Sequence, residues 1–185
     1  MVEISQQGVE ERSTDRSAAV RIHLERLDSG HADAILAGQD TALAAEIVGE
    51  RWSRESLDSF LARAARWQAD GPIREFAACI DGVLIGGGGL NLVDPGLERG
   101  EAALTYWILL PHRGRGHGHA LAAALTARAR VDPRISRLVL RIAPSNEASR
   151  ALARSIGAER TGEVERHPAD AARTVDRWVL ELRKS

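Results

Sequence analysis

The sequence is poor in cysteine and in long apolar runs, and both absences narrow the kind of protein that it encodes. Cys79 is the only cysteine, so neither an intramolecular disulfide nor a multi-cysteine metal site can form. Its apolar neighbours indicate a core residue rather than a nucleophile, and a lone cysteine fits a reducing compartment, so we expect a cytoplasmic protein. No apolar stretch approaches the roughly 18 residues that a membrane-spanning helix needs. Residues 1–15 are polar and acidic and do not match a secretory signal.

A large net charge of either sign is also absent. The sequence contains 25 Lys and Arg residues against 26 Asp and Glu residues, for a formal net charge of −1. This balance creates no global field toward nucleic acid or an anionic membrane, so we expect neither as a partner. Hydrophobic residues make up 44% of the sequence and charged residues 28%. This balance is typical of a globular domain with a buried core.

The order of apolar patterns predicts one mixed α/β domain after a polar arm. Residues 1–18 have few apolar anchors, and we expect them to form a mobile arm that precedes a single domain over residues 19–185. Strands and helices alternate in the second half of the chain, and there is no repeat or second domain boundary. The segments with a strand or helix pattern are a strand at 20–27, a broken helix at 29–37 and 41–48, a helix from Ser53 to about 70, strands at 74–80 and 83–93 joined by Asp81-Gly82, a strand at 102–110, a helix ending near Arg130, a strand at 138–142, a helix at 146–156 that Gly157 terminates, and a strand at 174–182.

A turn rich in glycine and arginine lies between a predicted buried strand and a predicted helix, at residues 113–118. Its backbone N–H groups and the positive end of the helix converge on one spot, which suits a phosphate group. Glycines in the turn remove side-chain atoms that would keep an anion from the main chain, and Arg113 and Arg115 add positive charge. A strand-to-helix connection without any ligand fits the same composition, and the composition leaves both interpretations open.

Known phosphate loops do not match this turn. It contains no lysine, which a nucleoside-triphosphate P-loop requires. Counted from Gly114, the sixth position of a dinucleotide fingerprint is His119 rather than glycine. A second glycine run, from Gly86 to Gly89, lies inside a predicted hairpin strand with no helix after it, and we interpret it as a bulge or a close backbone contact.

The stretch from Tyr106 to Gly118 resembles the acetyl-coenzyme A signature of the GNAT N-acetyltransferases. In that signature a strand is followed by Gln or Arg, then by glycine three residues later and by glycine or alanine two residues after that. Arg113, Gly116 and Gly118 fill this pattern. A register that begins at Arg115 also fits, but the spacing from the strand favours Arg113.

A second motif of the same family is matched further along the chain. Asn146, Ser149 and Gly157 resemble the Asn-x-x-Ser…Gly form found in the RimJ/RimL-type branch, which acetylates the N-termini of ribosomal proteins. The sequence departs from that branch at Ala158, where an aromatic residue is usual. The resemblance covers about residues 20–182, and two motifs at the right separation are far more specific than either alone.

The resemblance implies an α/β fold, in which helices cover both faces of a central mixed, mostly antiparallel sheet that is splayed at the coenzyme site. It implies an enzyme that transfers an acetyl group from acetyl-CoA, its co-substrate, to a primary amine by direct attack in a ternary complex. The amine acceptor is a protein N-terminus or a small molecule, and a homodimer is compatible with the family. No metal is expected, because the neighbouring histidines at 112, 117 and 119 have no acidic or thiol partner.

Two other functions fit the same residues. A catalytically silent acyl-CoA sensor would keep the glycine turn but lack a base, and Ala103 stands where the branch usually has a glutamate. An acyltransferase that uses another donor, such as succinyl-CoA, is compatible with the arginine-rich turn.

The resemblance places the coenzyme against the end of a strand, the glycine turn and the second motif. Backbone groups of the strand would contact the pantetheine, and the turn would hold the pyrophosphate. Asn146 also fits the N-cap of its helix, and the two roles can coexist. The residues expected to bind the coenzyme are Trp107, Ile108, Leu109, Arg113, Gly114, Arg115, Gly116, His117, Gly118, His119 and Asn146.

The reaction needs a proton acceptor and a proton donor. An alkylamine with a pKa near 10 is mostly protonated at neutral pH, so a carboxylate near the acyl carbon is expected to accept a proton. Glu101 is the candidate base, on the same strand face as Ala103, although a solvated loop acid fits this position equally well. Ser149 is the candidate donor to the departing thiolate, with local helix hydrogen bonding as the alternative. The reserve bases are Glu50, Glu46 and His112.

Overall fold

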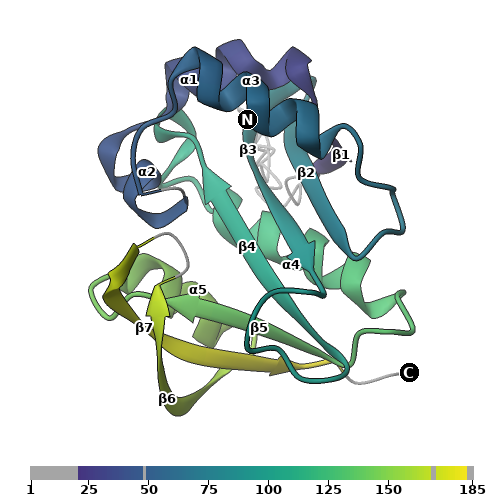
Figure 1. Ribbon diagram of the computed structural model, residues 1–185, viewed down its shortest axis with the longest axis vertical. Helices are drawn as coiled ribbons and strands as arrows, with labels where there is room; N and C mark the ends of the chain where they lie inside the picture. The colour runs from purple at the N-terminus through teal and green to yellow at the C-terminus, as the bar shows by residue number, and fades with distance from the viewer. Residues whose placement is uncertain (1–20, 48, 168–169, 183–185) are drawn as a thin grey trace, which may run out of the picture.

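Helices and strands are mixed along the part of the chain that the computed structural model describes, residues 21–47, 49–167 and 170–182 (Figure 1). The arm expected over residues 1–18 lies outside the described residues. The elements are β1 (His23–Arg26), the 3-10 turn η1 (Ser29–His31), α1 (Ala32–Gly38), α2 (Thr41–Ile47), α3 (Arg54–Ala64), β2 (Ile73–Ile80), β3 (Val83–Asn91), β4 (Glu101–Ile108), the 3-10 turn η2 (Leu110–His112), α4 (His117–Arg130), β5 (Arg137–Ile142), α5 (Glu147–Ser155), β6 (Glu159–His167) and β7 (Asp170–Glu181).

Within these residues the strands form one seven-stranded sheet in the order β1-β2-β3-β4-β5-β7-β6. Every neighbouring pair is antiparallel except β4 and β5, which are parallel. The prediction of a mixed, mostly antiparallel sheet is therefore confirmed. The single parallel pair is reached through α4, as a crossover between parallel strands requires.

The two parallel strands separate along their length. Residues Glu101 to Ala103 of β4 pair with Arg137 to Val139 of β5, and the pairing stops there although β4 continues to Ile108. In Figure 1 the two strands start together and diverge. The splay expected beside the coenzyme is thus present, and it leaves backbone groups of β4 without partners in β5.

Helices cover both faces of the sheet, and the alternation of side chains along β4 explains why. Leu104 points to the face where Leu121 and Leu125 of α4 are fully buried. Trp107 points to the other face, in a separate apolar cluster with residues of α1 and α3. The sheet therefore lies between an α1–α3 layer and an α4–α5 layer, as predicted.

Local turn and cap signals in the sequence are borne out. The Ser53 hydroxyl accepts a hydrogen bond from the Ser56 N–H at 3.1 Å and caps α3. Asp81 and Gly82 have φ of 50° and 78°, the positive values that a tight hairpin needs. Gly157 has φ of 87° directly after α5. None of the described helices is long and apolar enough to cross a membrane.

Strand β6 was not expected from the sequence. Most of its residues are exposed, and only its last residue, His167, is buried, so it lacks the alternation of apolar residues that identifies a strand. Its pairing with β7 determines its conformation. Strand β7 likewise begins at Asp170, before the predicted start at 174.

The glycine run of β3 provides room on both faces of the sheet. A Cβ at Gly87 would lie 2.4 Å from the Trp107 ring, and one at Gly88 would lie 2.8 Å from Leu125 in α4. The register shifts immediately before the run, where Ile85 is the extra residue of a bulge. The interpretation as a bulge or close backbone contact is confirmed.

Candidate active site

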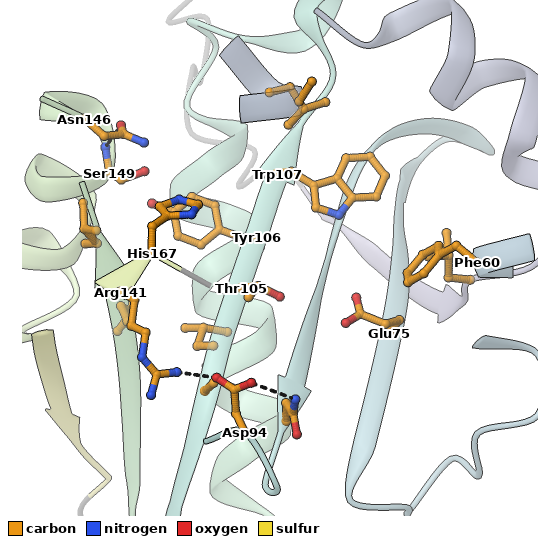
Figure 2. A pocket seen from close by; sticks show the side chains of 18 of the residues that line it. Phe60, Glu75, Asp94, Thr105, Tyr106, Trp107, Arg141, Asn146, Ser149 and His167 are labelled. Carbon is orange, nitrogen blue, oxygen red and sulfur yellow. Dashed lines mark hydrogen bonds and ion pairs between the residues drawn. The ribbon is translucent and has the colours of Figure 1, made fainter. Parts of the chain in front are cut away.

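A cavity of about 420 Å³ lies where β4 separates from β5, and its walls come from both faces of the sheet. Figure 2 shows Asn146, Ser149 and His167 on one side of β4, and Trp107, Phe60 and Glu75 on the other. The α1–α3 side is lined mainly by Leu27, Ile35, Leu43, Trp52, Leu57, Phe60, Arg63, Glu75, Thr105 and Trp107. The other side is lined by Tyr106, Ile142, Asn146 and Ser149, and His167 at the end of β6 also lines the cavity.

The second sequence motif forms the start of α5 at this cavity. The Asn146 side chain accepts a hydrogen bond from the Ser149 N–H at 3.1 Å, so it caps the helix while lining the cavity. Ser149 lies one turn further on, beside Tyr106. The Tyr106 hydroxyl is buried with no hydrogen bond of good geometry among the described residues. Burial raises the pKa of Tyr106, and the nearby Ser149 hydroxyl partly offsets this.

The glycine turn leads directly into α4. Gly114 and Gly116 have φ of 73° and 77°, and Gly116 is the N-cap of the helix. A Cβ at either position would meet nothing within 4 Å, so open space faces the turn. Arg115 is exposed and has no ion pair among the described residues. The turn therefore offers free N–H groups, a helix N-terminus and one available cation, which is the arrangement that binds a phosphate.

A model of the family described as Acetyltransferase (GNAT) domain matches residues 21–159. The chain belongs to the GNAT acetyltransferase family. A search of curated proteins finds no match.

Solved structures with the same fold share little sequence with this GNAT acetyltransferase. The spermidine N-acetyltransferase from Vibrio cholerae, solved with CoA and spermine, is 18% identical over 88% of this chain and 96% of that chain, with a TM-score of 0.72. RimL, a ribosomal L7/L12 alpha-N-protein acetyltransferase solved with coenzyme A, is 18% identical over 89% and 96%, with a TM-score of 0.72. AAC(6′)-Ib, solved with paromomycin and acetyl-CoA, is 16% identical over 86% and 93%, with a TM-score of 0.72.

Arg113, the first residue of the signature, is held by neighbouring protein groups. Both of its terminal nitrogens donate to the Asp40 carboxylate at 2.8 Å, and its Nε donates to the Ile108 carbonyl at 2.9 Å. Hydrogen bonding to Arg113 lowers the pKa of Asp40. Arg113 thus ties the start of α2 to the end of β4, and this arrangement positions the turn more than it presents charge to a ligand.

The backbone of β4 faces the cavity at alternate residues. The Leu109 N–H donates to the Ile85 carbonyl in β3 at 2.9 Å, so Leu109 does not offer this group to a ligand. Alternation then turns the N–H groups of Ile108 and Tyr106 toward the opening beside β5. The Trp107 side chain lies on the α1–α3 side, over Gly87. Of the expected backbone contacts, the opening favours Ile108 over Leu109.

The structure places Glu101 away from this cavity. It lies at the start of β4, buried, and its Oε2 accepts hydrogen bonds from Arg177 at 2.6 Å and from the Glu98 N–H at 2.8 Å. Burial raises the pKa of Glu101, but the Glu98 amide and Arg177 outweigh burial and hold that pKa below its usual value. Because its carboxylate is engaged and does not line the cavity, the geometry does not support Glu101 as the base.

The described reserve bases and the histidines of the glycine turn, at 112, 117 and 119, do not line the cavity either. Glu50 is exposed and does not line it, and the side chain of Glu46 is not described. The rings of His112 and His117 are 6.3 Å apart at the start of the turn and α4, and neither ring lines the cavity.

One group of three potential metal ligands exists among the residues described. Donor atoms of Glu25, His31 and Cys79 lie within 4.8 Å of one another, outside the cavity. These groups bind each other: the His31 ring is 2.9 Å from the Glu25 carboxylate, and the Cys79 thiol donates to it at 3.5 Å. Burial raises the pKa of Cys79 to about 11, which fits its predicted role as a core residue rather than a nucleophile.

Sequence reasoning missed Glu75. It lies in β2, half-buried, lines the cavity, and has no hydrogen bond or ion pair to its carboxylate among the described residues. Burial raises the pKa of Glu75 to about 7. The available signal was an acidic residue in line with Ala77, at an inward position of a strand in which Arg74 is the only other charged residue.

Proposed function

We propose that this GNAT acetyltransferase transfers the acetyl group of acetyl-CoA to a primary amine by direct attack within a ternary complex. The observation that carries the proposal is the separation of β4 from β5 beyond Ala103, which connects the two faces of the sheet at one cavity. A donor approaching from the α4–α5 side and an amine from the α1–α3 side would meet there. Structures of the same fold solved with CoA or acetyl-CoA support this proposal.

In this proposal the coenzyme spans the glycine turn and the opening. The pyrophosphate would contact the N–H groups of residues 114–118 at the start of α4, with Arg115 as the cation beside it. The pantetheine would lie along the unpaired edge of β4, near Tyr106 and Ile108. Asn146 would line the same path, and Arg113 would fix the shape of the turn.

The chemistry requires three proton movements, two from the amine nitrogen and one to the thiolate. The ammonium loses one proton before attack and a second as the tetrahedral intermediate collapses. The new C–N bond replaces the C–S bond of the thioester, and the departing thiolate gains one proton. Ser149 is the proposed donor, and the buried Tyr106 hydroxyl beside it can hand a proton on to Ser149.

The acceptor is a primary amine on a protein N-terminus or on a small molecule. The structural relatives act on acceptors of both kinds according to their names, which include spermidine and ribosomal L7/L12. We also propose a cytoplasmic location, on the basis of the lone cysteine, and a homodimer, on the basis of the family resemblance.

A catalytically silent acyl-CoA sensor is the second candidate, because Glu101 is engaged by Arg177 and Ala103 carries no carboxylate. Release of free thiol from acetyl-CoA in the presence of a mixed panel of primary amines separates the two functions. The enzyme releases thiol in proportion to acceptor. Saturable binding of acetyl-CoA without acceptor-dependent release of thiol would show that the protein is a sensor and not an enzyme. Competition by succinyl-CoA in the same assay tests the identity of the donor.

A further inference from the structure

Resting on the proposed function, we infer that the acceptor is a small monoamine with an apolar body, and that its ammonium group contacts Glu75. Three features of the α1–α3 side of the cavity lead to this inference. They are a carboxylate without a partner, an aromatic wall, and the absence of a second available acid among the described lining residues.

The Glu75 carboxylate lies in a space that a glycine creates. Glu75 pairs with Gly89 of β3, which pairs with Thr105 of β4, so these residues form one row across the sheet on the same face. A Cβ at Gly89 would lie 2.4 Å from Oε1 and 2.7 Å from Oε2 of Glu75. The carboxylate therefore extends over Gly89 toward Thr105, at the strand that borders the opening.

Aromatic rings line the same cavity as the carboxylate. Trp107 is one row along from Thr105 and lies over Gly87, and Figure 2 shows Glu75 below Trp107 and Phe60, on the same side of β4. Phe60 packs against Trp52 with ring centroids 5.1 Å apart. Ring faces beside a carboxylate favour an ammonium group with an apolar or aromatic substituent.

Among its described lining residues, the cavity offers no second free carboxylate for another cation. Asp94 also lines it, but its carboxylate is bound by Arg141 and by the Asn91 amide. Arg63 lines the α3 side, with its guanidinium 5.9 Å from the centre of the Phe60 ring. A polyamine or an aminoglycoside would bring several ammonium groups against these arginines, so the cavity disfavours such acceptors.

Titration of Glu75 supports this role. A desolvated carboxylate without a partner is costly, which is why burial raises the pKa of Glu75 to about 7. The other charged or titratable groups that line the described part of the cavity are Arg63 of α3, the Asp94–Arg141 pair and His167. In β1, Glu25 is bound to His31. An ammonium group supplies the missing countercharge. Glu75 then accepts its first proton, and the free amine attacks the acetyl carbon. As the C–S bond breaks, the second proton leaves the nitrogen for solvent and Ser149 protonates the thiolate. Before the next turnover Ser149 regains a proton from solvent and Glu75 releases its proton, so the net release is one proton.

The test compares four acceptors in a thiol-release assay with acetyl-CoA: 2-phenylethylamine, spermidine, kanamycin and a hexapeptide with a free N-terminus. We expect kcat/KM for 2-phenylethylamine to exceed that for each of the others by about tenfold or more. A preference for spermidine, kanamycin or the peptide overturns the inference while the proposed function stands. Absence of thiol release with all four amines overturns the proposed function and this inference together.

Three variants test Glu75 itself. Glu75→Gln should lower kcat/KM for 2-phenylethylamine about a hundredfold without changing acetyl-CoA affinity, and Glu75→Asp should restore part of the loss. Gly89→Ala should have the same direction of effect, because its Cβ meets only the flexible end of Glu75 among its nearest atoms. Glu181→Gln, at an exposed acid of β7, is the matched control. Unchanged acceptor kinetics in both Glu75→Gln and Gly89→Ala would overturn the assignment.

Discussion

At the scale of single residues, the most informative observation is a carboxylate that the fold does not neutralise. Most acidic side chains near the cavity are paired, including Asp40 with Arg113 and Glu165 with Arg141 and Arg177. Glu75 has no such partner among the described residues, and its pKa of about 7 reflects that cost. Active sites commonly retain such unfavourable groups because a ligand completes them.

Burial of the charged Glu75 carboxylate is unfavourable, so Glu75→Gln should raise the free energy of unfolding by an amount that depends on pH. Between pH 4.5, the ordinary pKa, and about 7, the folded protein keeps a proton that the unfolded chain releases. The free energy of unfolding of the wild type should therefore fall as pH rises through this window, by up to about 3 kcal/mol relative to Glu75→Gln. Urea unfolding without ligand at several pH values measures the difference. A difference independent of pH would mean that Glu75 is not desolvated.

Ser149 allows a second prediction at this scale. Ser149→Ala should lower kcat about tenfold, less than a typical general acid, because a thiolate leaves passably unaided. The deficit should shrink with an acyl donor whose thiol is more acidic, and Tyr106→Phe should show the same trend if the two hydroxyls act in sequence. Steady-state kinetics with both donors measures this. If Ser149→Ala is silent with every donor, water supplies the proton and Ser149 serves only α5.

At the scale of elements, a substitution in the glycine turn before α4 should weaken coenzyme binding without unfolding the protein. Gly116→Asp should reduce acetyl-CoA affinity about a hundredfold, because it places a carboxylate where a pyrophosphate would meet backbone N–H groups. Gly82→Asp is a matched control, since Gly82 has φ of 78° against 77° at Gly116, and a Cβ at either meets nothing within 4 Å. Calorimetric titration and circular dichroism measure affinity and folding. Equal affinity of the two variants would remove the turn from the site.

Strand β4 allows a test of whether Glu101 is a structural acid or the catalytic base. Glu101→Gln should destabilise the protein by about 3 kcal/mol, because it leaves Arg177 without its closest partner in a buried ion pair. Turnover per folded molecule should stay within a few-fold of the wild type. Thermal unfolding and kinetics at a temperature where both proteins are folded measure the two effects. A hundredfold loss of kcat with unchanged stability would return the base to Glu101.

At the scale of the whole molecule, the parallel pairing of β4 and β5 organises function. It is the one parallel junction in the described sheet, and it ends after Ala103. The α4–α5 layer has the glycine turn proposed to hold the pyrophosphate on one side of this opening, and the α1–α3 layer has an apolar cavity with Glu75 on the other. Donor and acceptor would therefore approach through different layers and meet between two strands.

The sequence by itself determined what depends on neighbouring residues. The Ser53 cap, the Asp81-Gly82 hairpin and the glycine turn after β4 all follow from local conformational preferences, and the family signature is a contiguous motif at that turn. The splayed sheet followed from the resemblance that this motif and the Asn146 motif carry.

Only the tertiary structure decided which acids and cations are available. Arg113 meets Asp40 across 73 residues, and Glu101 meets Arg177 across 76, so neither side chain is free as its position in the sequence suggested. Glu75 reaches the cavity because two strands place it beside Gly89 and in one row with Thr105. Strand pairing brings together residues that are distant in the chain, and burial then sets their charge. Neither effect can be read from a linear pattern.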